Sequence, residues 1–314
     1  MTQRRGPSGW VRAGQVVLAM ALLLLLWRVA GGQEALRSLL SANLYWLAAA
    51  VLLLTLQTVL SAIRWKVTAA RLGIRLGKAE AVREYYLSQA INVSVPGGVV
   101  GDAGRAVRSR GAAGLLAAGQ AVVFERLAGQ AGLFVVTATT FLVTLCWPGG
   151  VDWPAWLATP MSVFVASGLC LPFVLRASTR IGGRVGKTLR GFWVAMVQSL
   201  VARPVIVPQI GLSLATTCCN LAAFACCAKA VGQGLSPVAI MAFGPLILLT
   251  MLVPATISGW GLREGAAVIL FPLAGATASG GLAASVAFGL MLIVASLPGA
   301  VAVLGRRHSG PVGP

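Results

Sequence analysis

Two stretches of the chain place a proline, a glycine and an arginine at the same spacing. Both read V-P-x4-G-x3-R, one over residues 95–105 and the other over residues 253–263, so each half of the 314-residue chain holds one copy. A helix that begins beyond such a break exposes unpaired backbone N–H groups and the positive end of its dipole, and both favour an anion such as a phosphate. An arginine one turn inside that helix can add a bidentate contact. The two motifs therefore predict an anion-binding site.

The residues expected to bind a substrate come from these motifs and from one further charged pair. Glycine lets the backbone approach a ligand closely. An ionisable side chain at mid-bilayer costs roughly 3 kcal/mol or more, so it is expected to be paired or functional. The alternative for each glycine is tight helix crossing, but the identical spacing of two motifs favours function. The candidates are Pro96, Gly97, Gly98, Gly101, Asp102, Arg105, Glu125, Arg126, Gly259, Gly261, Arg263 and Glu264.

Of the seven acidic residues, only Asp102, Glu125 and Glu264 lie within or beside segments expected at membrane depth. Glu125 lies about ten residues, or ~15 Å, into its expected helix. Its neighbour Arg126 points elsewhere on that helix, so Glu125 needs another partner. We expect this partner to be Arg105 or Arg263. A structural ion pair and a role in handling substrate or protons both stay open for Glu125.

Composition places the chain in a bilayer. With 58% hydrophobic and 10% charged residues and a mean hydropathy of +0.86, a soluble globular domain is excluded. Most of the net charge of +18 falls between apolar segments, which indicates cytoplasmic loops and attraction to anionic headgroups rather than a nucleic-acid partner. The single histidine, His308, lies in the tail, and four of the six cysteines lie in an uncharged stretch. We therefore expect no metal, no cofactor and no nucleophilic catalysis.

Apolar segments near the ~20 residues needed to cross hydrocarbon define the scaffold. After a first helix around residues 16–26, spans are expected at residues 44–63, 115–145, 157–175, 205–228 and 281–304. Basic residues follow at 64–83 and 176–203 and mark these stretches as cytoplasmic, with a surface helix near 191–200. Residues 84–112 leave the first basic loop, break at the first motif and return to basic residues, which predicts a re-entrant hairpin.

Two foldings fit the second motif. Residues 237–253 and 265–276 are either full spans, giving eight helices and parallel halves, or arms of a hairpin from the outer side, giving six spans and inverted halves. The alignment of 44–145 with 205–304 slightly favours inversion. Breaks in corresponding positions of two halves are typical of a transporter binding site.

The predicted architecture is an all-α polytopic membrane protein of six to eight transmembrane helices with one or two re-entrant hairpins. We expect residues 1–314 to form a single membrane domain. The tails 1–13 and 305–314 are predicted to be cytoplasmic.

The motif residues resemble a known family. They are Pro96 to Arg105, Glu125-Arg126-Leu127 and Gly259 to Gly265, and they look like the lysylphosphatidylglycerol synthase transmembrane-region family of flippase-like proteins. The resemblance implies movement of aminoacylated or glycosylated lipids between the leaflets of a bacterial inner membrane. We expect the chain to act without the cytoplasmic aminoacyl-transferase domain to which this membrane unit is sometimes fused, so a cytoplasmic synthase or glycosyltransferase is a candidate partner.

Departures from the family pattern leave the lipid open. This chain has Gly129-Gln130 where the family often has an acid, and Thr256-Ile257-Ser258 where it commonly has Pro-Gly-Gly.

Three functions remain. A flippase would have a polar cavity between the motifs, where their arginines and amides hold a headgroup phosphate. A membrane-embedded transferase would need a base, for which Glu125 or Asp102 is the candidate. A non-catalytic protein would dock a synthase through the loops 64–83 and 176–203.

Overall fold

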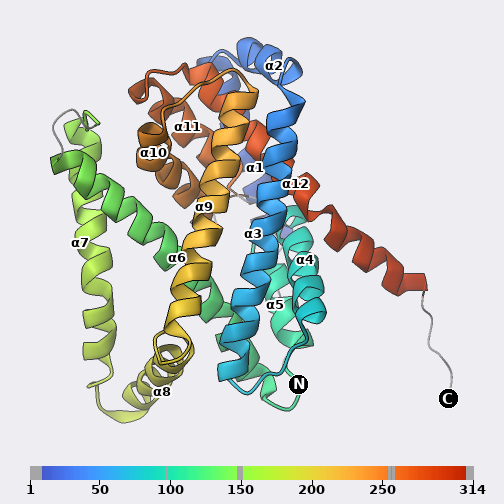
Figure 1. Cartoon of the computed structure of the whole chain (residues 1–314), viewed down its shortest axis with the longest axis vertical. Helices are drawn as coiled ribbons and strands as arrows, with labels where there is room; N and C mark the ends of the chain where they lie inside the picture. The colour runs from blue at the N-terminus through green and yellow to red at the C-terminus, as the bar shows by residue number, and fades with distance from the viewer. Residues whose placement is uncertain (1–8, 96–97, 147–150, 254–255, 257–258, 309–314) are drawn as a thin grey trace. The chain divides into compact units, whose positions relative to one another are not determined.

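The structure is a computed structural model, and every regular element among the residues it describes is a helix (Figure 1). It describes the chain apart from residues 1–8, 96–97, 147–150, 254–255, 257–258 and 309–314. The side chains described are those between residues 14 and 300. The all-helical prediction is confirmed.

The chain forms two compact units whose segments alternate along the sequence. Unit 1 comprises Met1–Thr58, Arg83–Arg105 and Cys219–Pro314, and unit 2 comprises Val59–Val82 and Ala106–Cys218. Two long helices, α3 (Leu44–Arg71) and α9 (Ile206–Ala230), contribute residues to both units. The internal repeat and its inversion stay predictions.

Unit 1 holds both motifs. Its remaining helices are α1 (Gly9–Val29), α2 (Gly32–Leu40), most of α4 (Lys78–Ser94) and α5 (Val100–Arg108), α10 (Pro237–Leu249), the 3-10 turn η1 (Thr250–Leu252), α11 (Leu262–Leu273) and α12 (Ala278–His308). The pair α1 and α2 bends by 95°, with Gly31 at φ 73° between them. The first helix thus begins at Gly9, inside the stretch that was predicted as a tail.

Small residues on α12 allow α11 to pack closely against it. Gly281, Ser285 and Gly289 recur every fourth residue and so share one face of the helix. A Cβ on Gly281 would lie 2.5 Å from the carbonyl oxygen of Ala267 on α11. Small-xxx-small spacing of this kind lets helix backbones approach in membranes.

Unit 2 contains a pair of long apolar helices, α6 (Gly114–Cys146) and α7 (Ala155–Ser178), and the helix α8 (Gly183–Leu200) that packs against both. The Phe134 and Phe164 rings of α6 and α7 meet edge to face with centroids 5.5 Å apart. Phe124 of α6 contacts Phe192 of α8 at 5.0 Å. The predicted surface helix near residues 191–200 therefore exists and begins earlier, at Gly183.

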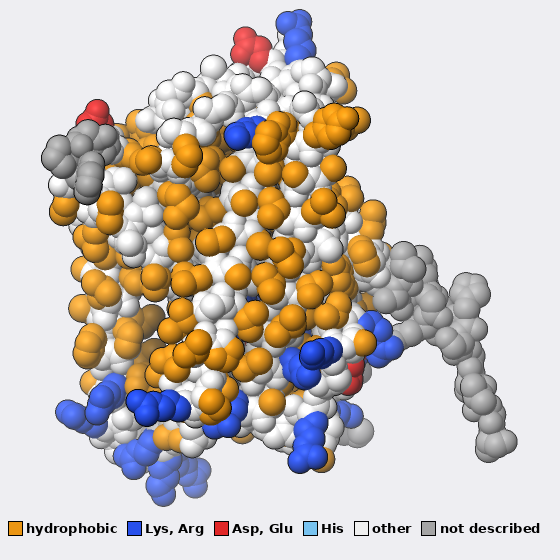
Figure 2. Space-filling view, viewed as in Figure 1, with side chains coloured by type: hydrophobic (Ala, Val, Ile, Leu, Met, Phe, Trp, Pro, Cys, Tyr) orange, Lys and Arg blue, Asp and Glu red, His pale blue; other side chains and the backbone are white. Residues whose placement is uncertain are grey.

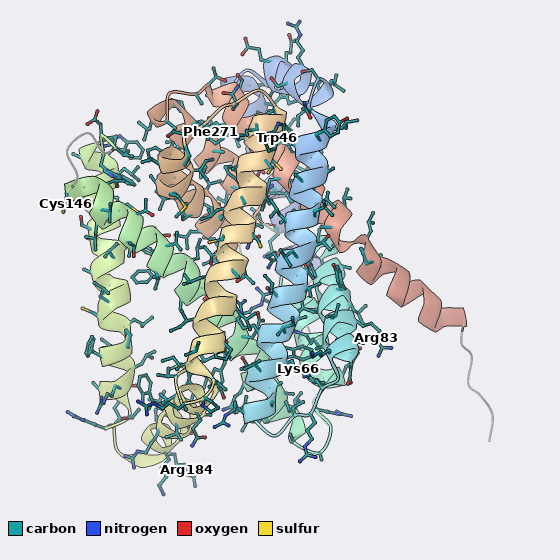
Figure 3. The ribbon with its side chains drawn as sticks, viewed as in Figure 1. Trp46, Lys66, Arg83, Cys146, Arg184 and Phe271 are labelled. Carbon is teal, nitrogen blue, oxygen red and sulfur yellow. The ribbon has the colours of Figure 1, made fainter. Side chains whose placement is uncertain are left out.

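Charge is segregated within unit 2. In Figure 3, Cys146 lies at one end of the unit and Lys66 and Arg184 lie toward the other. Figure 2 shows Lys and Arg side chains gathered over α8 and the adjoining end of α7, while hydrophobic side chains cover α7 between its ends. The basic side chains exposed on α8 and just before it are Arg176, Arg180, Arg184, Lys187 and Arg190.

Five described helices are long and apolar enough to cross a membrane, namely α3, α6, α7, α9 and residues Ala278–Ala300 of α12. A sixth is added if the bent pair α1 and α2 counts as one span. The protein is therefore a multi-pass membrane protein, and its described helices reach the predicted six to eight only at the lower bound. Residues Pro237–Leu252 form a shorter apolar helix, and whether the motifs are re-entrant stays a prediction.

The helix of the second predicted span does not end at Ile63. Helix α3 continues to Arg71 and carries Arg64 and Lys66 inside it. The helix can continue because Arg64 is buried at 4% exposure and has a buried partner, so the arginine does not have to lie in a solvated loop.

Candidate functional site

The first motif joins α4 to α5 in unit 1, and its glycines shape the break. Pro96 and Gly97 lie outside the described residues, whereas Gly98 has φ 59°, a conformation that favours glycine. A Cβ on Gly101 would collide with the backbone oxygen of Ser88 on α4. The N–H of Gly101 donates to Oδ1 of Asn92 at 2.8 Å. The start of α5 is therefore fixed closely against α4.

The charged residues of the first motif pair with each other. Arg105 Nη2 lies 3.0 Å from Asp102 Oδ1, one turn away on α5, and Ser88 Oγ donates to the same oxygen at 2.8 Å. The Arg105 guanidinium carbon is 4.5 Å from the centre of the Tyr85 ring. Arg105 is 1% exposed and Asp102 is 7% exposed. A carboxylate thus occupies the position that the sequence predicted for a bound anion. These two residues and their contacts with Ser88 and Tyr85 form the first-motif cluster.

The second motif ends at the start of α11. Pro254 lies outside the described residues, and Gly259 and Gly261 have φ values of 80° and 89°, which favour glycine. The N–H of Gly261 donates to Glu264 Oε2 at 2.6 Å. A carboxylate is the group that the positive end of a helix attracts. The protein's own Glu264 therefore satisfies the helix start where a substrate anion was predicted.

Arg263 is enclosed by the protein. Its Nη2 lies 2.6 Å from Glu264 Oε1, and its Nε donates to Ser285 Oγ of α12 at 2.9 Å. The rings of Trp260 and Phe288 each lie 5.4 Å from its guanidinium carbon. Arg263 and Glu264 are both 0% exposed. We call these five residues the second-motif cluster; it fastens the start of α11 to α12.

Helix α12 contacts both motif regions. A Cβ on Gly289 would lie 2.5 Å from Arg263 Nη2, and a Cβ on Gly299 would collide with the backbone oxygen of Tyr86 on α4. Ten residues of helix separate these two glycines, which is about 15 Å along the axis. Ser285 and Gly289 were not among the predicted site residues, although their four-residue spacing with Gly281 is visible in the sequence.

Glu125 belongs to unit 2 and pairs with an arginine that the sequence analysis placed in a loop. Its Oε1 lies 2.7 Å from Arg64 Nη2, and the two residues are 1% and 4% exposed. Arg64 Nη1 also donates to Thr216 Oγ1 of α9 at 2.9 Å and lies 3.4 Å from Ser213 Oγ. The charge of Arg64 is therefore matched by one carboxylate and two hydroxyl groups.

The predicted partners of Glu125 and its neighbour Arg126 lie in different places. Arg105 and Arg263 belong to unit 1, so their pairing with Glu125 stays a prediction. Arg126, the next residue on α6, is exposed and points to a different side of the helix from its buried neighbour.

The described residues form no cluster of possible metal ligands. Among the described residues, no three His, Cys, Asp or Glu side chains lie where they could hold a metal ion together. Three arginine–carboxylate pairs among the described residues have both partners buried within this helical membrane protein. Two of the pairs lie at the two breaks of unit 1, and the third lies inside unit 2.

The whole arrangement lies within the range of one family model. No curated protein sequence matches the chain. The model of the lysylphosphatidylglycerol synthase TM region, in contrast, matches residues 12–299 and so includes both motifs, the Arg64–Glu125 pair and α12 up to Gly299. The chain belongs to the lysylphosphatidylglycerol synthase transmembrane-region family.

Proposed function

We propose that this protein moves an anionic or modified lipid, aminoacylated or glycosylated, between the leaflets of a bacterial inner membrane. The observation that carries the proposal is the buried arginine–carboxylate pair at each break of unit 1. Burying ionised side chains in a membrane is costly, so such side chains are expected to be functional or to be paired with an opposite charge. A lipid headgroup supplies such charges: a phosphate for the arginine and, in an aminoacylated lipid, an ammonium for the carboxylate.

The proposed binding step is an exchange of partners. A phosphate replaces Asp102 on Arg105, and the released carboxylate turns to the cationic part of the headgroup or to solvent. Both states keep Arg105 in a charge-assisted hydrogen bond, so the exchange avoids an unpaired buried charge. The Tyr85 ring beside the guanidinium stays in place as a cation–π contact.

The two motifs take different parts in this scheme. The side chain of Asp102 is 9% exposed, whereas those of Arg263 and Glu264 are 1% and 0% exposed and are bound to each other. The first-motif cluster is therefore the better substrate site. We assign Arg263 and Glu264 to holding the start of α11 in position until α11 moves.

Charge segregation in unit 2 supports the orientation of the proposed transporter. Basic residues of α8 are exposed at one end, and Asp152 follows α6 at the other. At the latter end Trp153 Nε1 donates to Thr144 Oγ1 at 3.0 Å, which suits an interfacial tryptophan. The positive-inside rule then places α8 on the cytoplasmic side.

The test is lipid translocation in reconstituted vesicles that contain labelled phosphatidylglycerol or its lysyl ester. Arg105→Ala and the double variant Arg105→Ala/Arg263→Ala are expected to lose translocation, and Asp102→Asn is expected to slow it. Arg75→Ala is the matched control because Arg75 is an exposed arginine of unit 2. Translocation at the wild-type rate by the double variant would refute the proposed mechanism.

A second candidate function is docking of a cytoplasmic lipid-modifying synthase. The exposed basic residues of α8 favour it, since they offer a charged face to an acidic partner. Reversal of Arg184 and Lys187 to glutamate is expected to abolish co-purification of such an enzyme. Under the flippase proposal the same change leaves translocation in purified vesicles intact.

A further inference from the structure

A line of buried polar side chains runs through unit 2 from the end of α8 to Glu125. Gln209 Nε2 of α9 donates to the carbonyl oxygen of Ser199 at 3.3 Å and to Thr68 Oγ1 at 2.8 Å. Thr68 Oγ1 donates to the carbonyl oxygen of Arg64 at 3.0 Å, and Arg64 pairs with Glu125. We call these five residues the polar line. Each of them is at most 4% exposed.

Three atoms of the polar line have no hydrogen-bond partner among the described residues. They are Ser199 Oγ, Gln209 Oε1 and Arg64 Nε. Buried polar groups nearly always find a partner, and ordered water is the usual one where protein groups do not reach. The three atoms offer both donors and acceptors, which is the combination that bridging water requires.

We propose that water bridges these atoms and that the polar line carries protons from the turn between α8 and α9 to Glu125. The entry point is close to the surface: Ser199 is buried, but Val201 is 53% exposed two residues later. Arg203, also exposed, follows in the same turn. The inference rests on the proposed function and names the coupling ion for that transport.

The chemical step is a single proton transfer. A hydronium ion gives its proton to a carboxylate oxygen of Glu125, so one O–H bond breaks in the hydronium, one forms on the carboxyl group, and a water molecule remains. Arg64 then loses its anionic partner but keeps Thr216 Oγ1 and Ser213 Oγ as acceptors. These hydroxyl groups lower the penalty of leaving the guanidinium buried without a counter-charge.

Within unit 2, the ion pair described for Glu125 is the one with Arg64. Helix α3 contributes Arg64, and α9 contributes the hydroxyl groups that hold Arg64. Helix α8 contributes Phe192, which packs on Phe124 beside Glu125. Arg126 follows on α6 itself and is exposed. Protonation of Glu125 therefore releases the ion pair that joins α6 to α3 and permits a helix movement. Glu125 then gives the proton to water on the opposite side of the membrane, and its carboxylate pairs with Arg64 again.

The test uses the full chain in vesicles of phosphatidylcholine with phosphatidylglycerol, a pH-sensitive dye trapped inside and the membrane potential clamped. After an external acid pulse, wild-type protein is expected to acidify the interior faster than protein-free vesicles do. Glu125→Gln is expected to abolish this excess rate, and Gln209→Leu and Ser199→Ala to lower it about tenfold, the effect of losing one buried hydrogen-bonding group. Glu125→Asp is expected to restore part of it, which distinguishes proton transfer from a packing role.

Two variants at exposed polar residues outside the polar line serve as controls. Gln198→Leu changes an exposed glutamine next to Ser199, and Ser162→Ala changes an exposed serine of α7, so both are expected to leave the rate unchanged. Acid entry equal to that of protein-free vesicles, or a wild-type rate in folded Gln209→Leu, overturns the inference. Lipid translocation measured in the same vesicles separates the two proposals: lipid movement without proton entry refutes the polar line alone, and proton entry without lipid movement refutes the flippase alone.

Discussion

The guanidinium group of Arg64 lies directly against the bare backbone of Gly129. Gly129 follows Glu125 by one turn of α6, and a Cβ built on it would lie 2.7 Å from Arg64 Nη2. Glu125 supplies the charge that Arg64 needs, and Gly129 supplies the space. The absence of a side chain at Gly129 thus admits the arginine.

Alanine at position 129 should test this relationship. Gly129→Ala is expected to destabilise the protein by about 1–3 kcal/mol, since the added methyl group overpacks a closed site. Gly119→Ala on the same helix, where a Cβ meets nothing within 4 Å, is expected to be neutral or stabilising. The measurement is the free energy of unfolding in detergent. Equal effects of the two substitutions would mean that Arg64 moves away at little cost.

Removing one member of the Arg64–Glu125 pair should cost more than removing both. Arg64→Met or Glu125→Leu alone is expected to destabilise the protein by about 3–5 kcal/mol, because a buried charge loses its partner. The double variant is expected to recover part of that loss, and a double-mutant cycle gives the coupling. Additive losses in the cycle would show that the two side chains are not energetically linked.

Gly261 should need to be glycine for two separable reasons. Its φ of 89° disfavours any Cβ, and that Cβ would lie 2.8 Å from Leu22 Cβ of α1. Gly275 has φ 74° with open space around it, so Gly275→Ala reports backbone strain alone, about 1–2 kcal/mol. Gly261→Ala is expected to shift the unfolding midpoint further than Gly275→Ala does. A larger shift for Gly275→Ala would contradict the contact between α1 and the start of α11.

Ser285 should contribute through its two ionic neighbours. Its hydroxyl group donates to Glu264 Oε1 at 2.9 Å and accepts from Arg263 Nε. Ser285→Ala is expected to destabilise the protein by about 1–3 kcal/mol, since it leaves buried charged atoms without a hydrogen bond. Ser296→Ala is the control because that hydroxyl group bonds only along its own helix, to the carbonyl oxygen of Ile293, in the contacts described. Equal losses of stability in the two variants would mean that the contacts of Ser285 with Arg263 and Glu264 add no stability beyond that of a hydroxyl group bonded within the helix.

Much of the helical scaffold could be predicted because it follows from local composition. Long apolar runs leave few alternatives to a helix in a bilayer, so the ends of α6, predicted at 115 and 145, differ from the structure by one residue each. The end of α3 could not be placed in this way. Basic residues after an apolar run usually mark a loop, but Arg64 lies inside the helix, where Glu125, 61 residues later, neutralises it. A partner so distant in the sequence cannot be predicted from the residues around Arg64.

The motifs themselves were recognisable, but the direction of their arginines was not. Gly98, Gly259 and Gly261 have positive φ values, a backbone conformation that residues with a side chain rarely adopt. Proximity of an arginine to a helix start suggested that it faces a ligand. In the structure the carboxylates of Asp102 and Glu264 pair with these arginines themselves. Whether an arginine pairs with a carboxylate of the protein or with a bound anion depends on the packing around it.

Two of the glycines of α12, Gly289 and Gly299, bring this helix close to both motif regions of unit 1. A Cβ on Gly289 would meet Arg263, and a Cβ on Gly299 would meet the backbone oxygen of Tyr86. Helix α12 therefore packs closely against both the second-motif cluster and α4, the helix that leads into the first break. A displacement of α12 along or about its axis would therefore change both sets of contacts together. Helix α12 thus provides a direct mechanical connection between the two motif regions of unit 1.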